Sequence, residues 1–119
     1  MKIRKQSGFT LIEMLIVIIV IAVLAAVVVP KVVNVVSTSK TNSALVDIKI
    51  LNDAIERVRA DAGACPADAA KAATWLTSTA RPSDWPAGAN WSGPYVETVP
   101  TNPSTGAAFA FSATTCKFS

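Results

Sequence analysis

Hydrophobic residues are continuous near the start of the chain and become periodic further along. Residues 9–29, from Phe9 to Val29, contain a single charge, Glu13. As a helix this segment would measure roughly 30 Å, enough to cross the hydrocarbon core of a membrane. Beyond it, apolar side chains recur every three or four residues, which predicts an amphipathic helix with one buried face. The members of this stripe are Leu45, Ile48, Leu51, Ile55, Val58 and Ala62.

Together the two patterns predict one long helix over residues 9–62, ended by Gly63. Pro30 lies inside this helix and removes one backbone hydrogen bond. Residues 32–39, which follow it, are mostly β-branched or polar and have weak helix propensity. The sequence therefore predicts a disturbance at Pro30, either a simple kink or a locally unwound segment.

Residues 63–119 differ from the rest, because Pro, Gly, Ala, Ser, Thr and Trp dominate them. Their pattern predicts a short helix over residues 67–76 and strands over 95–99, 107–112 and 114–118. The core of this region should consist mainly of aromatic rings: Trp75, Trp85, Trp91, Tyr95, Phe109 and Phe111. The predicted fold class is α+β, with a long N-terminal helix packed on a small antiparallel β-sheet. That helix has a transmembrane half and an amphipathic half.

The net charge of +3 has a local origin. Lys2, Arg4 and Lys5 precede the apolar segment, and without them eight basic residues face eight acidic ones. A near-neutral body gives no reason to expect a specific nucleic-acid partner. The basic cluster also places the N-terminus in the cytoplasm by the positive-inside rule. The chain has no histidine, and no set of residues in it suggests catalysis, a cofactor or a metal site. We therefore do not expect an enzyme.

Two cysteines, Cys65 and Cys116, lie beyond the apolar segment, on the side that should face away from the cytoplasm. Disulfides persist in such compartments, so one bridge is favoured over two buried thiols. The bridge would close a loop of about 50 residues and stabilise the fold by roughly 4 kcal/mol in the chain-entropy model.

Glu13 is costly within a membrane, by roughly 2.5–3.5 kcal/mol on insertion scales. Two interpretations are open on physical grounds alone: the carboxylate lies near the cytoplasmic interface or is protonated, or it finds a partner in another molecule. An ordinary secretory signal peptide is an alternative for the whole segment. The apolar run is too long for one, and it contains a carboxylate.

Residues 7–17 (SGFTLIEMLIV) resemble the class III signal peptide of type IV pilins and of type II secretion pseudopilins. The resemblance covers residues 4–30 and implies a leader, residues 1–8, that a prepilin peptidase removes between Gly8 and Phe9. The same peptidase would N-methylate Phe9. The resemblance also implies that Glu13 pairs with the freed amine of Phe9 on a neighbouring subunit, and that Pro30 is the family's helix-bending proline.

The implied organisation has four parts: the leader (1–8), a transmembrane or filament-core helix (9–29), its amphipathic continuation (30–62) and a small disulfide-stapled globular head (63–119). The precursor would reside in the inner membrane, with its N-terminus in the cytoplasm. Its partners would be further copies of itself, minor pilins, the peptidase and an assembly platform. The product would be an extracellular or periplasmic filament.

A second, weaker resemblance concerns residues 91–103 (WSGPYVETVPTNP), which are similar to a run in the major pseudopilins of type II secretion. That group often binds calcium in its C-terminal loops, yet Glu97 is the sole acidic residue in the range 85–119. Hard carboxylate ligands are therefore scarce.

Three hypotheses for the function are open, two from the resemblance and one from a different class. The first is a type IV pilus subunit that serves adhesion, motility or DNA uptake. The alternative is a type II secretion pseudopilin, and the third is a single-pass anchored binding module that does not polymerise.

Overall fold

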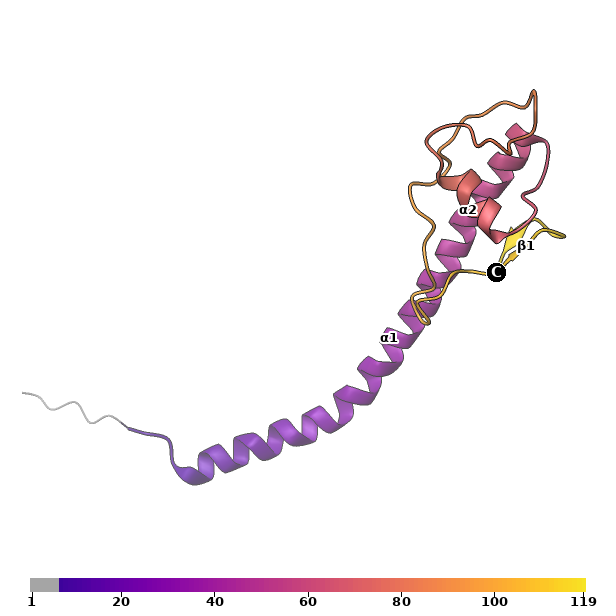
Figure 1. Cartoon of the computed structure of the whole chain (residues 1–119). Helices are drawn as coiled ribbons and strands as arrows, with labels where there is room; N and C mark the ends of the chain where they lie inside the picture. Colours follow the sequence, from indigo (N-terminus) through magenta and orange to yellow (C-terminus); the bar gives the residue numbers. More distant parts are fainter. Residues whose placement is uncertain (1–6) are drawn as a thin grey trace, which may run out of the picture. The chain divides into compact units, whose positions relative to one another are not determined.

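The computed structural model describes residues 7–119, so the basic residues Lys2, Arg4 and Lys5 lie outside the described part. The chain divides into an N-terminal unit, which ends at Thr38, and a C-terminal unit, Ser39–Ser119. Helix α1 (Leu11–Ala62) contributes to both units. Helix α2 (Ala69–Thr77) and strands β1 (Phe111–Ser112) and β2 (Lys117–Phe118) belong to the C-terminal unit (Figure 1). The α+β class is confirmed.

In the N-terminal unit α1 continues without interruption through Pro30. The weak helix formers that follow Pro30 also stay helical, and the hydroxyl of Thr38 donates a hydrogen bond of 3.0 Å to the carbonyl of Asn34. The locally unwound segment is therefore absent from this unit as described. A bend at Pro30 stays a prediction.

In the C-terminal unit the apolar stripe of α1 forms the centre of the core. Leu51, Ile55 and Val58 are completely buried, and Ile48 packs against the core at its edge. The predicted start of the stripe is wrong, because Leu45 is 62% exposed and Ala44 is buried instead. At about 100° per residue, Ala44 lies within about 20° of Leu51 around the helix, whereas Leu45 lies about 120° away.

Helix α2 begins at Ala69, two residues later than the predicted start at residue 67. The side chain of Asp68 caps it by accepting a 2.8 Å hydrogen bond from the backbone N–H of Lys71. The helix buries Trp75 and Leu76 in the same core as the stripe of α1. Figure 1 shows α2 beside the last turns of α1.

The sheet has two short strands in the described residues. Strands β1 and β2 pair antiparallel, with Phe111 opposite Phe118. The predicted strand over residues 95–99 is wrong: the N–H groups of Tyr95 and Val96 both donate to the carbonyl of Leu76, at 2.9 and 3.1 Å. These donors therefore bind the end of α2 and are not available to a strand ladder.

The predicted aromatic core is formed, though not all of its members are fully buried. Trp75, Trp85 and Phe109 are buried, while Trp91, Tyr95 and Phe111 pack partly exposed against them. Four of the rings form one continuous cluster, with centroids 4.7–6.3 Å apart: Trp75, Trp85, Trp91 and Tyr95.

Candidate assembly site and the disulfide-pinned C-terminal unit

Glu13 closes a capping box with Thr10 at the first turn of α1. Its carboxylate accepts hydrogen bonds from the backbone N–H of Thr10 at 2.7 Å and from the Thr10 hydroxyl at 2.9 Å. In return the hydroxyl accepts a hydrogen bond from the N–H of Glu13 at 3.3 Å. This reciprocal arrangement satisfies the otherwise unpaired donors of a helix start. Glu13 thus has polar partners within its own chain, although neither of them neutralises its charge.

The predicted cleavage site lies just before this cap. Residues 7–10 are not helical, and Gly8 and Phe9 are both exposed. A side chain at Gly8 would meet no atom within 4 Å. The peptide bond between Gly8 and Phe9 therefore lies in an exposed, non-helical segment directly ahead of the helix.

The apolar part of α1 is exposed along its whole length in the single chain. Side chains from Leu11 to Val36 cover every side of the helix, and none of this span is buried. By length and composition alone, the helix is able to cross a membrane. So much unpartnered apolar surface requires lipid or other helices around it.

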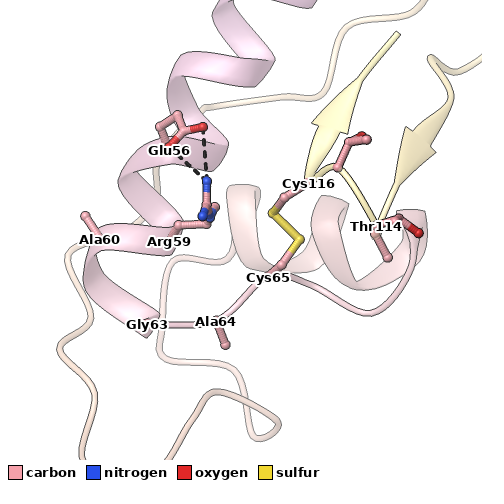
Figure 2. A pocket seen from close by; sticks show the side chains of 10 residues that line it. Glu56, Arg59, Ala60, Gly63, Ala64, Cys65, Thr114 and Cys116 are labelled. Atoms are coloured by element: carbon pink, nitrogen blue, oxygen red, sulfur yellow. Dashed lines mark hydrogen bonds and ion pairs between the residues drawn. A yellow bond between two sulfur atoms is a disulfide. The ribbon is translucent and has the colours of Figure 1, made fainter.

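The predicted bridge between Cys65 and Cys116 is present, with the two Cα atoms 5.9 Å apart. Both half-cystines line an open pocket of about 500 Å³ at the end of α1 (Figure 2). Glu56 and Arg59 form an ion pair of 3.3 Å on the helix side of this pocket. On the opposite side lies the turn between β1 and β2, which carries Cys116. The bridge therefore ties the hairpin to the segment that follows α1.

A second contact fixes the same hairpin to the middle of α1. The side-chain amide of Asn52 accepts a 2.7 Å hydrogen bond from the N–H of Phe118 and donates one of 3.2 Å to its carbonyl. Phe118 is buried, and its ring lies 4.9 Å from that of Phe111. An amide side chain that takes the place of a neighbouring strand in this way holds β2 against the helix.

Tyr95 links the aromatic cluster to the last turns of α1. Its hydroxyl donates a 2.6 Å hydrogen bond to Asp61 and accepts a longer one from the N–H of Ser92. Burial, with help from the hydrogen bond to Asp61, raises the pKa of Tyr95 to about 12. The phenol therefore stays protonated and keeps donating well beyond its usual range.

The residues of the C-terminal unit do not fit a calcium ion, the metal that the pseudopilin resemblance implies. Calcium takes six to eight oxygen ligands, several of them carboxylates. Four acidic side chains already have partners in the fold: Glu56, Asp61, Asp68 and Asp84. Among residues 7–119 no three His, Cys, Asp or Glu side chains come together as a metal site would require.

The loop that precedes β1 uses its own oxygen atoms internally. The carbonyl of Asn102 accepts from Gly106 at 2.7 Å, and the carbonyl of Ala107 accepts from Asn102 at 2.8 Å. The side-chain oxygen of Asn102 accepts from Ser104 at 2.8 Å. These oxygen atoms thus already accept hydrogen bonds from N–H groups of their own loop.

Sequence reasoning missed Thr10, Asn52 and Asp61 as important residues. For Thr10 a signal existed, because a Thr followed three residues later by Glu ahead of an apolar run is the pattern of a capping box. The partners of Asn52 and Asp61 are 66 and 34 residues away in the sequence, and no local pattern reports such contacts.

Comparison with known families gives two matches that together cover most of the chain. Residues 3–29 match the prokaryotic N-terminal methylation motif, and residues 31–117 match the type II secretion system (T2SS) protein G family. Searches of curated proteins and of solved structures returned no match. These findings favour the pseudopilin alternative over the type IV pilus, and they lend no support to adhesion or motility. The chain belongs to the type II secretion system protein G family and is a structural pseudopilin, not an enzyme.

Proposed function

We propose that this chain is a filament-forming subunit of a type II secretion pseudopilus, made as an inner-membrane precursor and assembled in the periplasm. The observation that carries the proposal is the match of residues 31–117 to the protein G family, directly after a methylation motif over residues 3–29. The exposed apolar length of α1 supports the same conclusion, because such a helix requires lipid before assembly and neighbouring helices afterwards.

In the proposed maturation, a prepilin peptidase cuts between Gly8 and Phe9 and methylates the new amine of Phe9. The open segment at residues 7–10 supports access of the peptidase to this bond. Removal of the leader places a positive amine one residue ahead of Thr10. In the filament, the amine of one subunit pairs with Glu13 of its neighbour, which fixes the axial register because a shifted subunit would leave both charges unpaired.

Processing is tested on protein purified from its native membrane. Mass spectrometry of the N-terminal peptide should show a chain that begins at N-methylated Phe9. A chain that retains Met1 and Gly8 would contradict the maturation and would support the third hypothesis, an anchored binding module.

Function is tested in a deletion strain complemented with wild type or with Glu13→Ala. Loss of the chain should trap a type II substrate in the periplasm, and wild type should restore its release. Glu13→Ala should be inserted and processed yet fail to restore release. If secretion is normal in the deletion strain and the chain is found instead in filaments sheared from the cell surface, the type IV pilus hypothesis replaces this one.

A further inference from the structure

The segment after Glu97 has little regular structure of its own, yet it contributes three buried residues to the core. Phe109, Cys116 and Phe118 are 5–6% exposed, while the strands in this segment are only two residues long each. Two-residue strands and a few side chains do not stabilise a segment of this length alone, so other contacts must hold it in place.

We infer that the disulfide and the Asn52 amide hold this segment in the place of a metal ion, so that the C-terminal unit folds without calcium and depends on oxidation of Cys65 and Cys116. The inference concerns the folding of a single chain and goes beyond the proposed role in secretion.

Two anchors restrain the hairpin at neighbouring positions. Cys116 is bonded to Cys65, just past the end of α1, and Phe118 is bound on both backbone groups by Asn52. Asn52 lies 13 residues before Cys65, and the first ten of these belong to α1. Residues 116 and 118 are therefore bound from two separate points of the chain, Cys65 and Asn52. This fixes the position and the register of β2.

The remaining contacts complete the restraint with backbone groups. Ala110 and Ser119 exchange two hydrogen bonds, of 3.1 and 2.9 Å, next to the β1–β2 pair. Earlier in the chain, Thr101 and Ala108 form an isolated antiparallel β-bridge through their backbones. Every contact in this set is made by protein groups with each other.

The charge distribution agrees with this assignment. A calcium site in the same loops would have Glu97 as its single carboxylate, and Glu97 is exposed. One exposed carboxylate is too weak a ligand set for a tightly held divalent ion.

The test is a thermal unfolding measurement on the full-length chain in detergent, with tryptophan fluorescence as the readout. All three tryptophans of the chain, Trp75, Trp85 and Trp91, lie in the C-terminal unit, so the signal reports that unit alone. Millimolar calcium and the chelator EGTA should give Tm values that agree within about 1 °C. A calcium site filled at 100 times its dissociation constant would instead raise the Tm by more than about 10 °C.

Reduction with excess phosphine should lower the Tm by more than about 10 °C, because it removes a cross-link between residues 51 apart. The double variant Cys65→Ser, Cys116→Ser should match the reduced wild type and no longer respond to reductant. If the double variant does not fold, the reduced wild type alone supplies this comparison.

Glu97→Gln is the matched control for a metal ligand, and its Tm should equal that of the wild type in both calcium and EGTA. Two results would overturn the inference: a rise in Tm with calcium, whether or not Glu97→Gln abolishes it, or a Tm that is unchanged on reduction. Since the readout is the folding of one chain in detergent, neither result bears on whether the chain assembles into a pseudopilus.

Discussion

The protonated hydroxyl of Tyr95 donates a hydrogen bond to the carboxylate of Asp61. Because this contact exists only in the folded chain, the pKa of Tyr95 reports whether the chain is folded. Its pKa is raised from an ordinary value of 10.0 to about 12, first by burial and then by the hydrogen bond to Asp61. Between these two values the unfolded chain loses the phenol proton while the folded chain keeps it. Stability contributed by this proton is therefore complete below pH 10 and falls as the pH rises toward about 12.

The measurement is simple because Tyr95 is the only tyrosine in the chain. The ultraviolet absorbance of its phenolate should appear with a midpoint clearly above 10 in the folded protein, and near 10 in denaturant. Tyr95→Phe should weaken the loss of stability between pH 10 and 12 that urea titrations detect in the wild type. Equal midpoints in the folded and denatured protein would contradict the buried contact with Asp61.

Gly93 is required by a close approach of an aromatic ring. A Cβ atom at this position would meet the Trp91 ring, with Cη2 at 2.6 Å and Cε2 at 3.0 Å. Gly93→Ala therefore forces the ring to move, and Trp85 and Tyr95 pack on that same ring. We expect the substitution to lower the free energy of unfolding by about 1–3 kcal/mol.

Gly88→Ala offers an instructive comparison. Gly88 also lies in a loop of the C-terminal unit, but it is surrounded by open space and has a positive φ of 79°. Its substitution should cost about 1–2 kcal/mol through backbone strain, without disturbing the ring cluster. Near-ultraviolet circular dichroism separates the two effects: Gly93→Ala should change the tryptophan signal and Gly88→Ala should not.

At the scale of elements, the sequence predicts the helices better than the strands. The periodic stripe of α1 locates the core from Leu51 to Ala62, because helical periodicity is a local property. It fails at Leu45, because the small Ala44 and not Leu45 lies on the buried face of the helix. Size is a poorer guide here than angular position.

The strands are shorter and fewer than the sequence pattern predicts, for a different reason. Alternation around Phe109 and Phe111 does predict a strand, and β1 occupies the end of that range. In the range 95–99, the N–H groups of Tyr95 and Val96 donate instead to the carbonyl of Leu76, which has no partner within α2 because it lies at the end of that helix. A tertiary partner of that kind leaves no trace in the local pattern.

A substitution at Asn52 weakens the attachment of the β1–β2 hairpin to α1 while leaving the disulfide intact. Asn52→Ala removes both hydrogen bonds to the backbone of Phe118 and leaves that N–H without its partner. The expected loss is about 1–3 kcal/mol in the free energy of unfolding. Hydrogen exchange should become faster at residues 110–119 and stay unchanged in α2.

Lys49→Ala is the control for Asn52→Ala, since Lys49 is exposed on the same helix one turn earlier. It should leave both stability and exchange at the wild-type level. Unchanged exchange at residues 110–119 in Asn52→Ala would mean that the disulfide alone positions β2.

At the scale of the whole molecule, the chain combines a unit that cannot be stable alone in water with one that has its own core. The N-terminal unit exposes apolar side chains on all sides, while the C-terminal unit buries its stripe, its aromatic rings and a disulfide. The first therefore needs lipid or other copies around it, whereas the second has a core of its own. Such a division suits a subunit that is stored in a membrane, passes into a filament and keeps one folded unit throughout.

Glu13 would have two roles: it caps the start of its own helix, and in the filament it would pair with the amine of a neighbouring subunit. Two substitutions separate these roles. Glu13→Gln keeps an oxygen acceptor for the Thr10 groups but removes the charge. Thr10→Val keeps the charge but removes the hydroxyl, and the backbone N–H of Thr10 still donates to the carboxylate. Capping is thus retained in the first variant, and the capacity to pair with an amine is retained in the second.

If assembly depends on pairing with the Phe9 amine of a neighbour, Glu13→Gln should be processed normally yet form at least about tenfold fewer cross-linked oligomers in membranes. The free-energy cost of removing one partner from a desolvated charge pair corresponds to a tenfold change or more. Thr10→Val should lose part of a cap, about 0.5–2 kcal/mol, and assemble close to the wild-type level. The reverse result, with Thr10→Val defective and Glu13→Gln normal, would mean that Glu13 serves the start of its own helix and that register is set elsewhere.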